Sequence, residues 1–386
     1  MRWTVTDDIY AETWRQLLEF SNIELTTDVL VKKHGEPKSK SHRENLTKQA
    51  TQARVCVLQA KEYFDAARAA SLFTSPNHCY YGAVALASLM LLVLGDGTKS
   101  LDYLRADNRN NHHGLEFTTG CNAKSASTGI TLVEHSRVEI LEFGHFSNWY
   151  KQLPSRWSVS AIVEQSFGAT NSISMKSIGG YTVPVFDTIV GSKRTLLDLL
   201  TFLPDLDSDL QRYGISAVRS RTSHEVRQDQ DGHTTHTWRI HGCRSESELE
   251  ALLEEFAVTS RFADALSFHG PDNAQSGIVS LRYKQPELIG IRWPTCRDTM
   301  NHDSISYAGM FETHEIVDLY LVSYQLSMLS RYFPDIWVRC IESQCRAAKL
   351  IERATGIITK KLPILTLSML NGEETVISTH REPWKN

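Results

Sequence analysis

The sequence predicts a mainly α-helical α+β fold. Two long stretches, one in the first quarter of the chain and one near its end, repeat apolar residues at helical spacing. Between them glycine and serine are frequent, and short runs of β-type residues appear. The 386 residues also exceed what one hydrophobic core usually supports. We therefore predict a helical region over 1–117, a mixed β/α region over 118–311, and a helical pair with a short β tail over 312–386 that packs back on the first region.

The first region is predicted to contain a short amphipathic helix and two long helices. The last helix lies between Pro76 and Gly95, because proline is favoured at helix starts and glycine at helix ends. The polar, basic segment 32–48 is interpreted as a linker or exposed loop. The predicted helices cover 7–20, 46–71 and 77–94. A short loop joins the two long helices, so we expect them to pack antiparallel.

The middle region is predicted to combine short strands with two helices. Asp231-Gly232 is a favoured hairpin dipeptide, and it predicts a β-hairpin over 216–242. Ser245 and Glu248 form a capping box for a helix that runs to about residue 266. Pro204 ends the other helix, 195–203. Further β segments are predicted over 129–133, 137–143, 157–163 and 277–293.

The last region is predicted to hold two helices, 312–332 and 336–355, separated by Pro334. Cys340 and Cys345 would then lie five positions apart on one helix and point to different faces. One or two short strands are expected within 361–380.

Composition narrows the classes of protein that the chain can belong to. The net charge of −4 argues against a protein that coats nucleic acid by bulk charge, although it permits a local basic patch. None of the seven cysteines forms a CxxC pair, so we expect no metal and no cofactor, and a reducing compartment. Walker A, GxGxxG, GxSxG and HExxH motifs are absent from the sequence. The most apolar run, 79–94, is shorter than the roughly 20 residues of a membrane-spanning helix, and we expect a cytoplasmic protein without a membrane segment.

Three separated segments resemble the YaaC-like family of bacterial proteins. They are Tyr80-Tyr81-Gly82 with Leu86, then His113-Gly114-Leu115, and then SMLSRYFPDIW over 327–337. The last segment is the most specific of the three. The resemblance implies a fold and a bacterial origin, and it implies no settled biochemical activity.

The first region also resembles HEPN domains, which are helical bundles and include many metal-independent ribonucleases. Those enzymes carry an arginine and a histidine separated by a short spacer, and Arg105 and His112 have six residues between them, with Ala106 where a polar residue is usual. The resemblance implies that His112 or His113 transfers protons, while Arg105, with Arg109 nearby, holds the phosphate. In the alternative, His113 hydrogen-bonds within the bundle and the arginines face solvent.

The predicted hairpin offers a second candidate site. Alternate residues of a strand share a face, and Trp238 and Ile240 would take the face opposite to the basic residues. That basic face could bind phosphates or single-stranded nucleic acid, or it could be an ordinary solvated surface. Its residues are Arg219, Arg221, Arg227, His233, Arg239 and His241.

Arg331 lies inside an apolar helix pattern, where an unpaired charge is costly to bury. We expect it to meet a carboxylate or to reach the surface, and a role in ligand binding is the alternative.

Three hypotheses for function follow. The first is a regulatory or binding component that acts through RNA or a protein partner in a bacterial defence or stress module. The second is a metal-independent ribonuclease that uses Arg105 and His112, as a homodimer because HEPN sites are commonly shared between two chains. The third is a nucleotide or nucleic-acid binder that uses the basic hairpin.

Overall fold

The computed structural model confirms a mainly α-helical α+β fold. For the strands between 156 and 182 and between 219 and 306, the structure describes the backbone. The described residues are 2–37, 39–154, 156–158, 162–167, 171–176, 180–182, 186–215, 219–228, 233–241, 247, 263–269, 276–284, 295–297, 303–306, 314–373 and 375–379.

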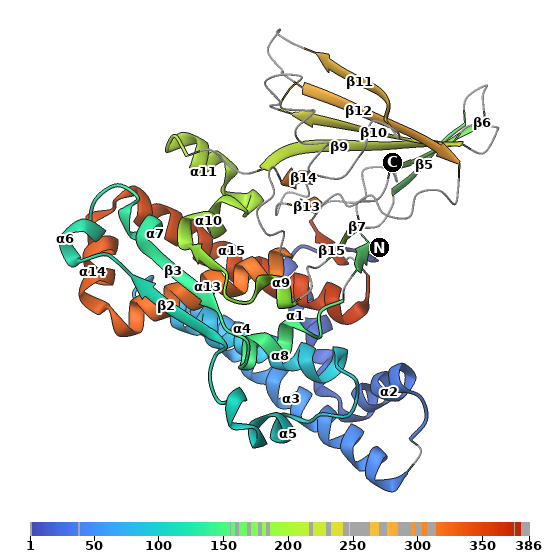
Figure 1. The fold of residues 1–386 in the computed structure, drawn as a ribbon. Coiled ribbons are helices and arrows are strands. Elements are labelled where there is room, and N and C mark those ends of the chain that lie inside the picture. Colours follow the sequence, from blue (N-terminus) through green and yellow to red (C-terminus); the bar gives the residue numbers. More distant parts are fainter. Residues whose placement is uncertain are drawn as a thin grey trace.

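Two long helices, α3 (Lys40–Ala69) and α4 (Ser75–Leu94), form the first region, and they lie side by side in Figure 1. They are joined by residues 70–74, and this short turn makes them antiparallel, as predicted. They approach closely at Gly82, where an added Cβ would lie 2.7 Å from the Phe64 ring. The shorter helices around them are α1 (Ile9–Leu17), η1 (Leu18–Ser21), α2 (Ile23–His34), α5 (Leu101–Ala106) and η2 (Asn108–Asn110).

The prediction of a loop over 32–48 was wrong for most of that segment. Helix α2 continues to His34 and α3 begins at Lys40. The Ser39 side chain caps α3 by accepting a hydrogen bond from the backbone N–H of His42. Lysine, arginine and glutamate favour helices, and the buried Leu46 anchors this end of α3. The basic run is therefore the solvated end of two helices.

Helix α4 is the centre of the helical core. It packs against α3, against α13 (Glu315–Tyr332) and against α15 (Arg346–Asn371). Among the described helices it is the one whose length and composition would allow it to cross a membrane, and 67% of its apolar window is buried inside the fold. A buried core helix passes the same test.

The C-terminal region has three helices where the sequence predicted two. Helix α14 (Pro334–Ser343) ends at Gln344, which adopts the left-handed conformation (φ 52°), and α15 begins at Arg346. The break turns the chain so that the sulfur atoms of Cys340 and Cys345 lie 3.8 Å apart, which corrects the prediction that they point to different faces.

Helix α15 also continues where strands were predicted. It passes through Pro363, which is buried together with Leu362 and Leu367. Proline removes one helical hydrogen bond, but the packing of this apolar face keeps the helix intact to Asn371. One strand of the predicted tail is present, β15 (Thr375–Ser378), and it pairs in parallel with β1 (Arg2–Val5).

A small three-stranded antiparallel sheet contacts α13 through its strand β3. Strand β3 (Ser136–Ile140) confirms the strand predicted over 137–143, and it lies between β2 (Leu115–Thr119) and β8 (Lys193–Thr195). The strand predicted over 129–133 is wrong for residues 131–133, which belong to helix α7 (Thr131–His135). The predicted region boundary after residue 117 falls inside β2. Short helices complete this part: α6 (Ala123–Ala126), α8 (His145–Tyr150), α9 (Phe186–Ile189), α10 (Leu196–Thr201), η3 (Pro204–Leu206) and α11 (Asp207–Arg212).

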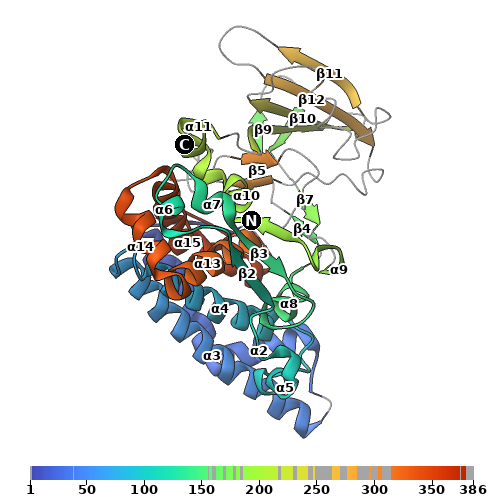
Figure 2. The ribbon, with the colours of Figure 1, turned by 60° about the vertical axis from the view of Figure 1, so that its left-hand side comes forward.

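A larger antiparallel sheet stands to one side of the helices in both ribbon views (Figures 1 and 2). Strands β9 (Arg219–Gln228) and β10 (His233–His241) are its centre, and their pairing confirms the predicted hairpin strands, while the turn between them lies outside the described residues. The strand order is β11–β12–β10–β9–β14–β13, and the β5–β6 pair joins β9 through β6. The other strands are β5 (Ile162–Phe167), β6 (Asn171–Lys176), β11 (Ala263–His269), β12 (Ser276–Lys284), β13 (Thr295–Arg297) and β14 (Asp303–Ser306), with a separate pair β4 (Arg156–Ser158) and β7 (Gly180–Thr182).

The helix predicted to run from Ser245 to residue 266 is corrected at its end, because residues 263–266 belong to strand β11. The capping box and the remainder of that predicted helix, apart from residue 247, fall outside the described residues. Strand β12 matches the first part of the β segment predicted over 277–293.

Candidate functional site

Three segments that are far apart in the sequence meet at one place in the helical core. They are the N-terminal half of α4, residues 113–115, and the C-terminal half of α13. The Tyr80 hydroxyl lies 2.8 Å from His113 Nδ1, and the Tyr324 hydroxyl donates to the Leu115 carbonyl at 3.0 Å. Asn77 Oδ1 accepts hydrogen bonds from Ser327 and Ser330 at 3.2 and 2.8 Å.

A cluster of tyrosine and histidine side chains runs inward from this meeting point. The rings of Tyr80 and Tyr320 pack edge to face, with their centroids 5.8 Å apart. The Tyr320 hydroxyl lies 3.3 Å from His145 Nδ1, and His145 Nε2 lies 2.9 Å from Ser88 Oγ. Burial raises the pKa of Tyr80 and Tyr320. Both tyrosines therefore stay protonated at neutral pH, and each has a hydrogen to donate.

The two histidines of this cluster are neutral. Burial, followed by the charge of His113, lowers the pKa of His145 to about 4. Burial, followed by the charges of Arg331 and His112, lowers the pKa of His113. Which group donates in each of these hydrogen bonds depends on the tautomer of the two histidines. When His113 Nδ1 carries the hydrogen and donates to Tyr80, His113 Nε2 is a hydrogen-bond acceptor.

Arg331 lies beside this cluster, at the end of α13. Its Nη1 donates to the Tyr81 hydroxyl at 2.7 Å, and its guanidinium lies over the rings of Tyr81 and Tyr332, at 5.3 and 5.0 Å from their centroids. Among the described residues, no carboxylate forms a salt bridge with it. The arginine therefore reaches the surface, as expected in one of the alternatives, between two aromatic side chains.

The predicted catalytic arginine and histidine are engaged elsewhere. Arg105 lies on α5 and forms a solvent-exposed ion pair with Asp102 at 3.6 Å. His112 is exposed, and its Nδ1 accepts a hydrogen bond from the backbone N–H of Gly114 at 3.0 Å. Within the described part of the chain, no hydrogen bond or ion pair joins Arg105 to His112, so their pairing stays a prediction.

Arg109 and His113 follow the alternative that the sequence left open. Arg109 forms an exposed ion pair with Asp107 at 2.7 Å and lies over the Phe143 ring, with its guanidinium carbon 4.7 Å from the centroid. His113 is half-buried and bound to Tyr80. The arginines are thus solvated, whereas His113 belongs to the core.

Sequence reasoning did not identify His145, Tyr320 and Ser88 as site residues. Their side chains come together only in the fold, because 175 residues separate His145 from Tyr320. The three segments that resemble the YaaC-like family are the part of the sequence that lies at this meeting point.

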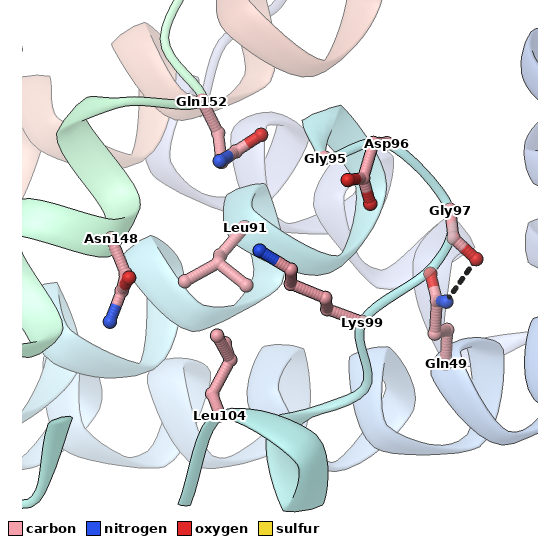
Figure 3. A pocket seen from close by; sticks show the side chains of 9 residues that line it. All are labelled: Gln49, Leu91, Gly95, Asp96, Gly97, Lys99, Leu104, Asn148 and Gln152. Atoms are coloured by element: carbon pink, nitrogen blue, oxygen red, sulfur yellow. Dashed lines mark hydrogen bonds between the residues drawn. The ribbon is translucent and has the colours of Figure 1, made fainter. Parts of the chain in front are cut away.

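A pocket at the C-terminal end of α4 is too small to be a substrate site (Figure 3). Asp96, Lys99, Asn148 and Gln152 are among its lining residues, and Gln49 closes one side by donating to the Gly97 carbonyl at 2.8 Å. Its cavity volume is about 30 Å³, which is space for about two water molecules.

Within the described ranges, no group of three or more His, Cys, Asp or Glu residues is arranged to hold a metal ion.

The register of the large sheet places the predicted basic residues relative to one another. Thr235 of β10 pairs with Arg227 of β9, and Arg239 pairs with Ser223. Paired positions share a face, and so do alternate positions along each strand. The following positions therefore lie on one face of the sheet: Arg219, Arg221, Arg227, His233, Arg239 and His241.

The structure thus defines an α+β protein with a helical core that carries a cluster of tyrosines and histidines. Most strands of its large antiparallel sheet come from the segment between α11 and α13. The chain belongs to the YaaC-like family, because the family model of the YaaC-like proteins matches residues 18–370, nearly its whole length. No curated protein and no solved structure matches it. The likeness of the first region to HEPN domains stays a prediction.

Proposed function

We propose that this YaaC-like protein is a binding or regulatory component that binds RNA, and that one face of the large sheet contacts the RNA phosphates. The register of β9, β10 and β12 supports the proposal. Arg282 of β12 pairs with Thr235, and Lys284 pairs with His233, so both add cationic positions to the face that holds Arg227. Glu225 occupies the same face and lowers its net positive charge.

The two faces of the sheet differ in composition. Trp238 pairs with Val279, and His236 pairs with Val226 and Leu281, so most of these positions on the second face are apolar. Neighbouring strands lie about 4.8 Å apart, and cations on adjacent strands can therefore form a row that follows a phosphate backbone. A protein with a net charge of −4 would then bind RNA by a local surface.

The test is fluorescence anisotropy with a labelled single-stranded RNA at several salt concentrations. The double variant Arg227→Ala/Arg239→Ala should weaken binding and reduce the salt slope by about 1.4, because each lost phosphate contact on a single strand contributes about 0.7. The control Arg43→Ala/Arg54→Ala removes the same charge from exposed positions of α3 and should bind as wild type. If both double variants lost the same RNA affinity, binding would depend on net charge alone, and the proposal would be wrong.

Metal-independent RNA cleavage is a second candidate function, and the state of His113 favours it. A half-buried, neutral histidine with an acceptor nitrogen can take a proton from a 2′-hydroxyl. We would incubate cellular RNA in EDTA with wild type, Arg105→Ala, His112→Ala and His113→Gln. Loss of cleavage in the first two variants would support the pair indicated by the HEPN resemblance, and loss in the third alone would support His113. Intact RNA with the wild type would contradict this candidate and leave the proposal of RNA binding standing.

A further inference from the structure

We infer that Arg331, Tyr81, Tyr332 and His113 form a binding site for a nucleoside phosphate, either free or at the end of single-stranded RNA. The site lies on the helical core and is separate from the sheet face proposed above. Arg331 would hold the phosphate, an exposed tyrosine would stack with the base, and His113 would accept a hydrogen bond from a ribose hydroxyl.

The charge of Arg331 is the first argument. The residue is half-buried, and among the described side chains its acceptors are the Tyr81 hydroxyl and, at 3.7 Å, the weakly accepting sulfur of Met328. Its Nε is shielded from solvent and has no acceptor. Incomplete hydration and pairing of a guanidinium are unfavourable. A phosphate at the exposed nitrogens would compensate this charge, and arginine is well suited to bind phosphate.

The aromatic surroundings are the second argument. Tyr332 is 61% exposed and Tyr81 is 37% exposed, so both rings offer surface next to the guanidinium. Tyr81 is held in place from behind by stacking on Tyr63, with ring centroids 5.6 Å apart. Exposed aromatic rings beside a cation are the combination with which proteins bind nucleobases and their phosphates.

The neutral state of His113 is the third argument, and it selects among anions. Its Nδ1 lies 2.8 Å from the Tyr80 hydroxyl, and in the tautomer in which Nδ1 donates this hydrogen bond, Nε2 presents a lone pair. The nearby charge of Arg331 itself disfavours protonation of the ring. A lone pair repels an inorganic anion but accepts a hydrogen bond from a hydroxyl group. In a nucleotide, the ribose hydroxyl can donate a hydrogen bond to His113 while the phosphate binds Arg331. This favours a nucleotide over inorganic phosphate.

The test is titration calorimetry of the full chain with AMP, adenosine, inorganic phosphate and a 5′-phosphorylated oligoadenylate. We expect the two ligands that carry both base and phosphate to bind, and adenosine and phosphate to bind at least tenfold more weakly. Arg331→Gln should weaken binding about tenfold or more, since a hydrogen bond to a charged group is strong. Tyr332→Ala should weaken it about fivefold or more.

Matched controls separate this site from other effects. Tyr103→Ala removes a tyrosine that is 62% exposed on α5, and Arg54→Gln removes an exposed arginine of α3; both should bind as wild type. Thermal melts of all variants would report folding, and Tyr332→Ala changes only an exposed side chain.

The outcomes distinguish the two sources of the ligand. Binding of AMP that depends on Arg331 and Tyr332 supports a free nucleotide, whereas binding of the oligonucleotide alone, with the same dependence, supports the end of an RNA. The inference is overturned if neither ligand binds at millimolar concentration, or if binding is unchanged in both variants. Arg227→Ala/Arg239→Ala should leave AMP binding intact, so failure of the sheet proposal and failure of this one are separate results.

Discussion

His145 shows how a single residue can make the stability of this fold depend on pH. Its ring nitrogens face Ser88 and Tyr320, and burial together with the charge of His113 lowers its pKa from 6.5 to about 4. The folded state therefore disfavours protonation, whereas the unfolded chain accepts a proton at about pH 6.5. Stability is fully present above pH 6.5 and is lost as the pH falls from 6.5 toward 4.

The first prediction concerns the stability that is lost when the pH falls below 6.5. Between pH 7.5 and pH 5, His145 should lower the free energy of unfolding by about 1 to 2 kcal/mol, given a pKa difference of more than two units at a half-buried position. Urea denaturation at the two pH values measures it. His145→Gln should be less stable at pH 7.5 but should lose less stability on going to pH 5. An equal loss in the variant and the wild type would show that other groups cause the pH dependence.

At the scale of helices, two glycines in similar secondary structure should respond to alanine in opposite ways. A Cβ at Gly82 of α4 would lie 2.7 and 2.8 Å from two ring atoms of Phe64, which is fully buried and cannot easily move. A Cβ at Gly356 of α15 would meet no atom within 4 Å. The intrinsic preference of a helix for alanine over glycine is the same at both positions.

We therefore predict that Gly82→Ala destabilises the protein by about 1–3 kcal/mol, because overpacking outweighs helix propensity. Gly356→Ala should stabilise it by about 0.5–1 kcal/mol. Denaturant midpoints measured at one pH give both values. If Gly82→Ala also stabilised the protein, the close packing of α3 on α4 would be refuted.

Elements were predictable from the sequence where local signals and packing agree. Pro76 and Gly95 bracket α4, and the structure places its ends within two residues of the prediction. Predictions failed where packing outweighs local signals: Pro363 stays inside α15, and a polar run extends α2 and α3. The strand β2 was missed because its alternation of apolar and polar residues covers only five residues and directly follows a polar segment.

The candidate site was predictable only in part, because packing between distant segments decides its contacts. His113 was identified because it belongs to a short motif, and its hydrogen bond within the bundle was one of the two alternatives. The neighbours that decide its chemistry are Tyr80 and Arg331, which are 33 and 218 positions away in sequence. A local pattern cannot report such contacts, since they arise from the packing of α4 against α13.

At the scale of the whole molecule, one buried ionic cluster contains residues from both sides of the β9–β14 segment of the large sheet. Asp205 in η3 precedes the first strand of the β9–β14 segment, and Glu315 at the start of α13 follows its last strand. Lys361 of α15 hydrogen-bonds both carboxylates, with Asp205 at 2.8 Å. All three side chains are at most 8% exposed. One cation thus joins both ends of the sheet segment to the last helix.

Lys361→Met should destabilise the protein by about 3–5 kcal/mol, because it removes a cation that hydrogen-bonds two buried carboxylates. The control Lys349→Met breaks an exposed pair with Glu352 on the same helix and should change stability by less than about 0.5 kcal/mol. Adding Asp205→Asn and Glu315→Gln to Lys361→Met should restore much of the loss, since the two negative charges are then removed together with the positive one. Urea denaturation gives the stabilities, and limited proteolysis reports whether residues 216–313 become easier to cleave. A failure of the triple variant to recover stability, with Lys361→Met still strongly destabilised, would mean that Lys361 acts through the packing of its aliphatic chain instead of its charge.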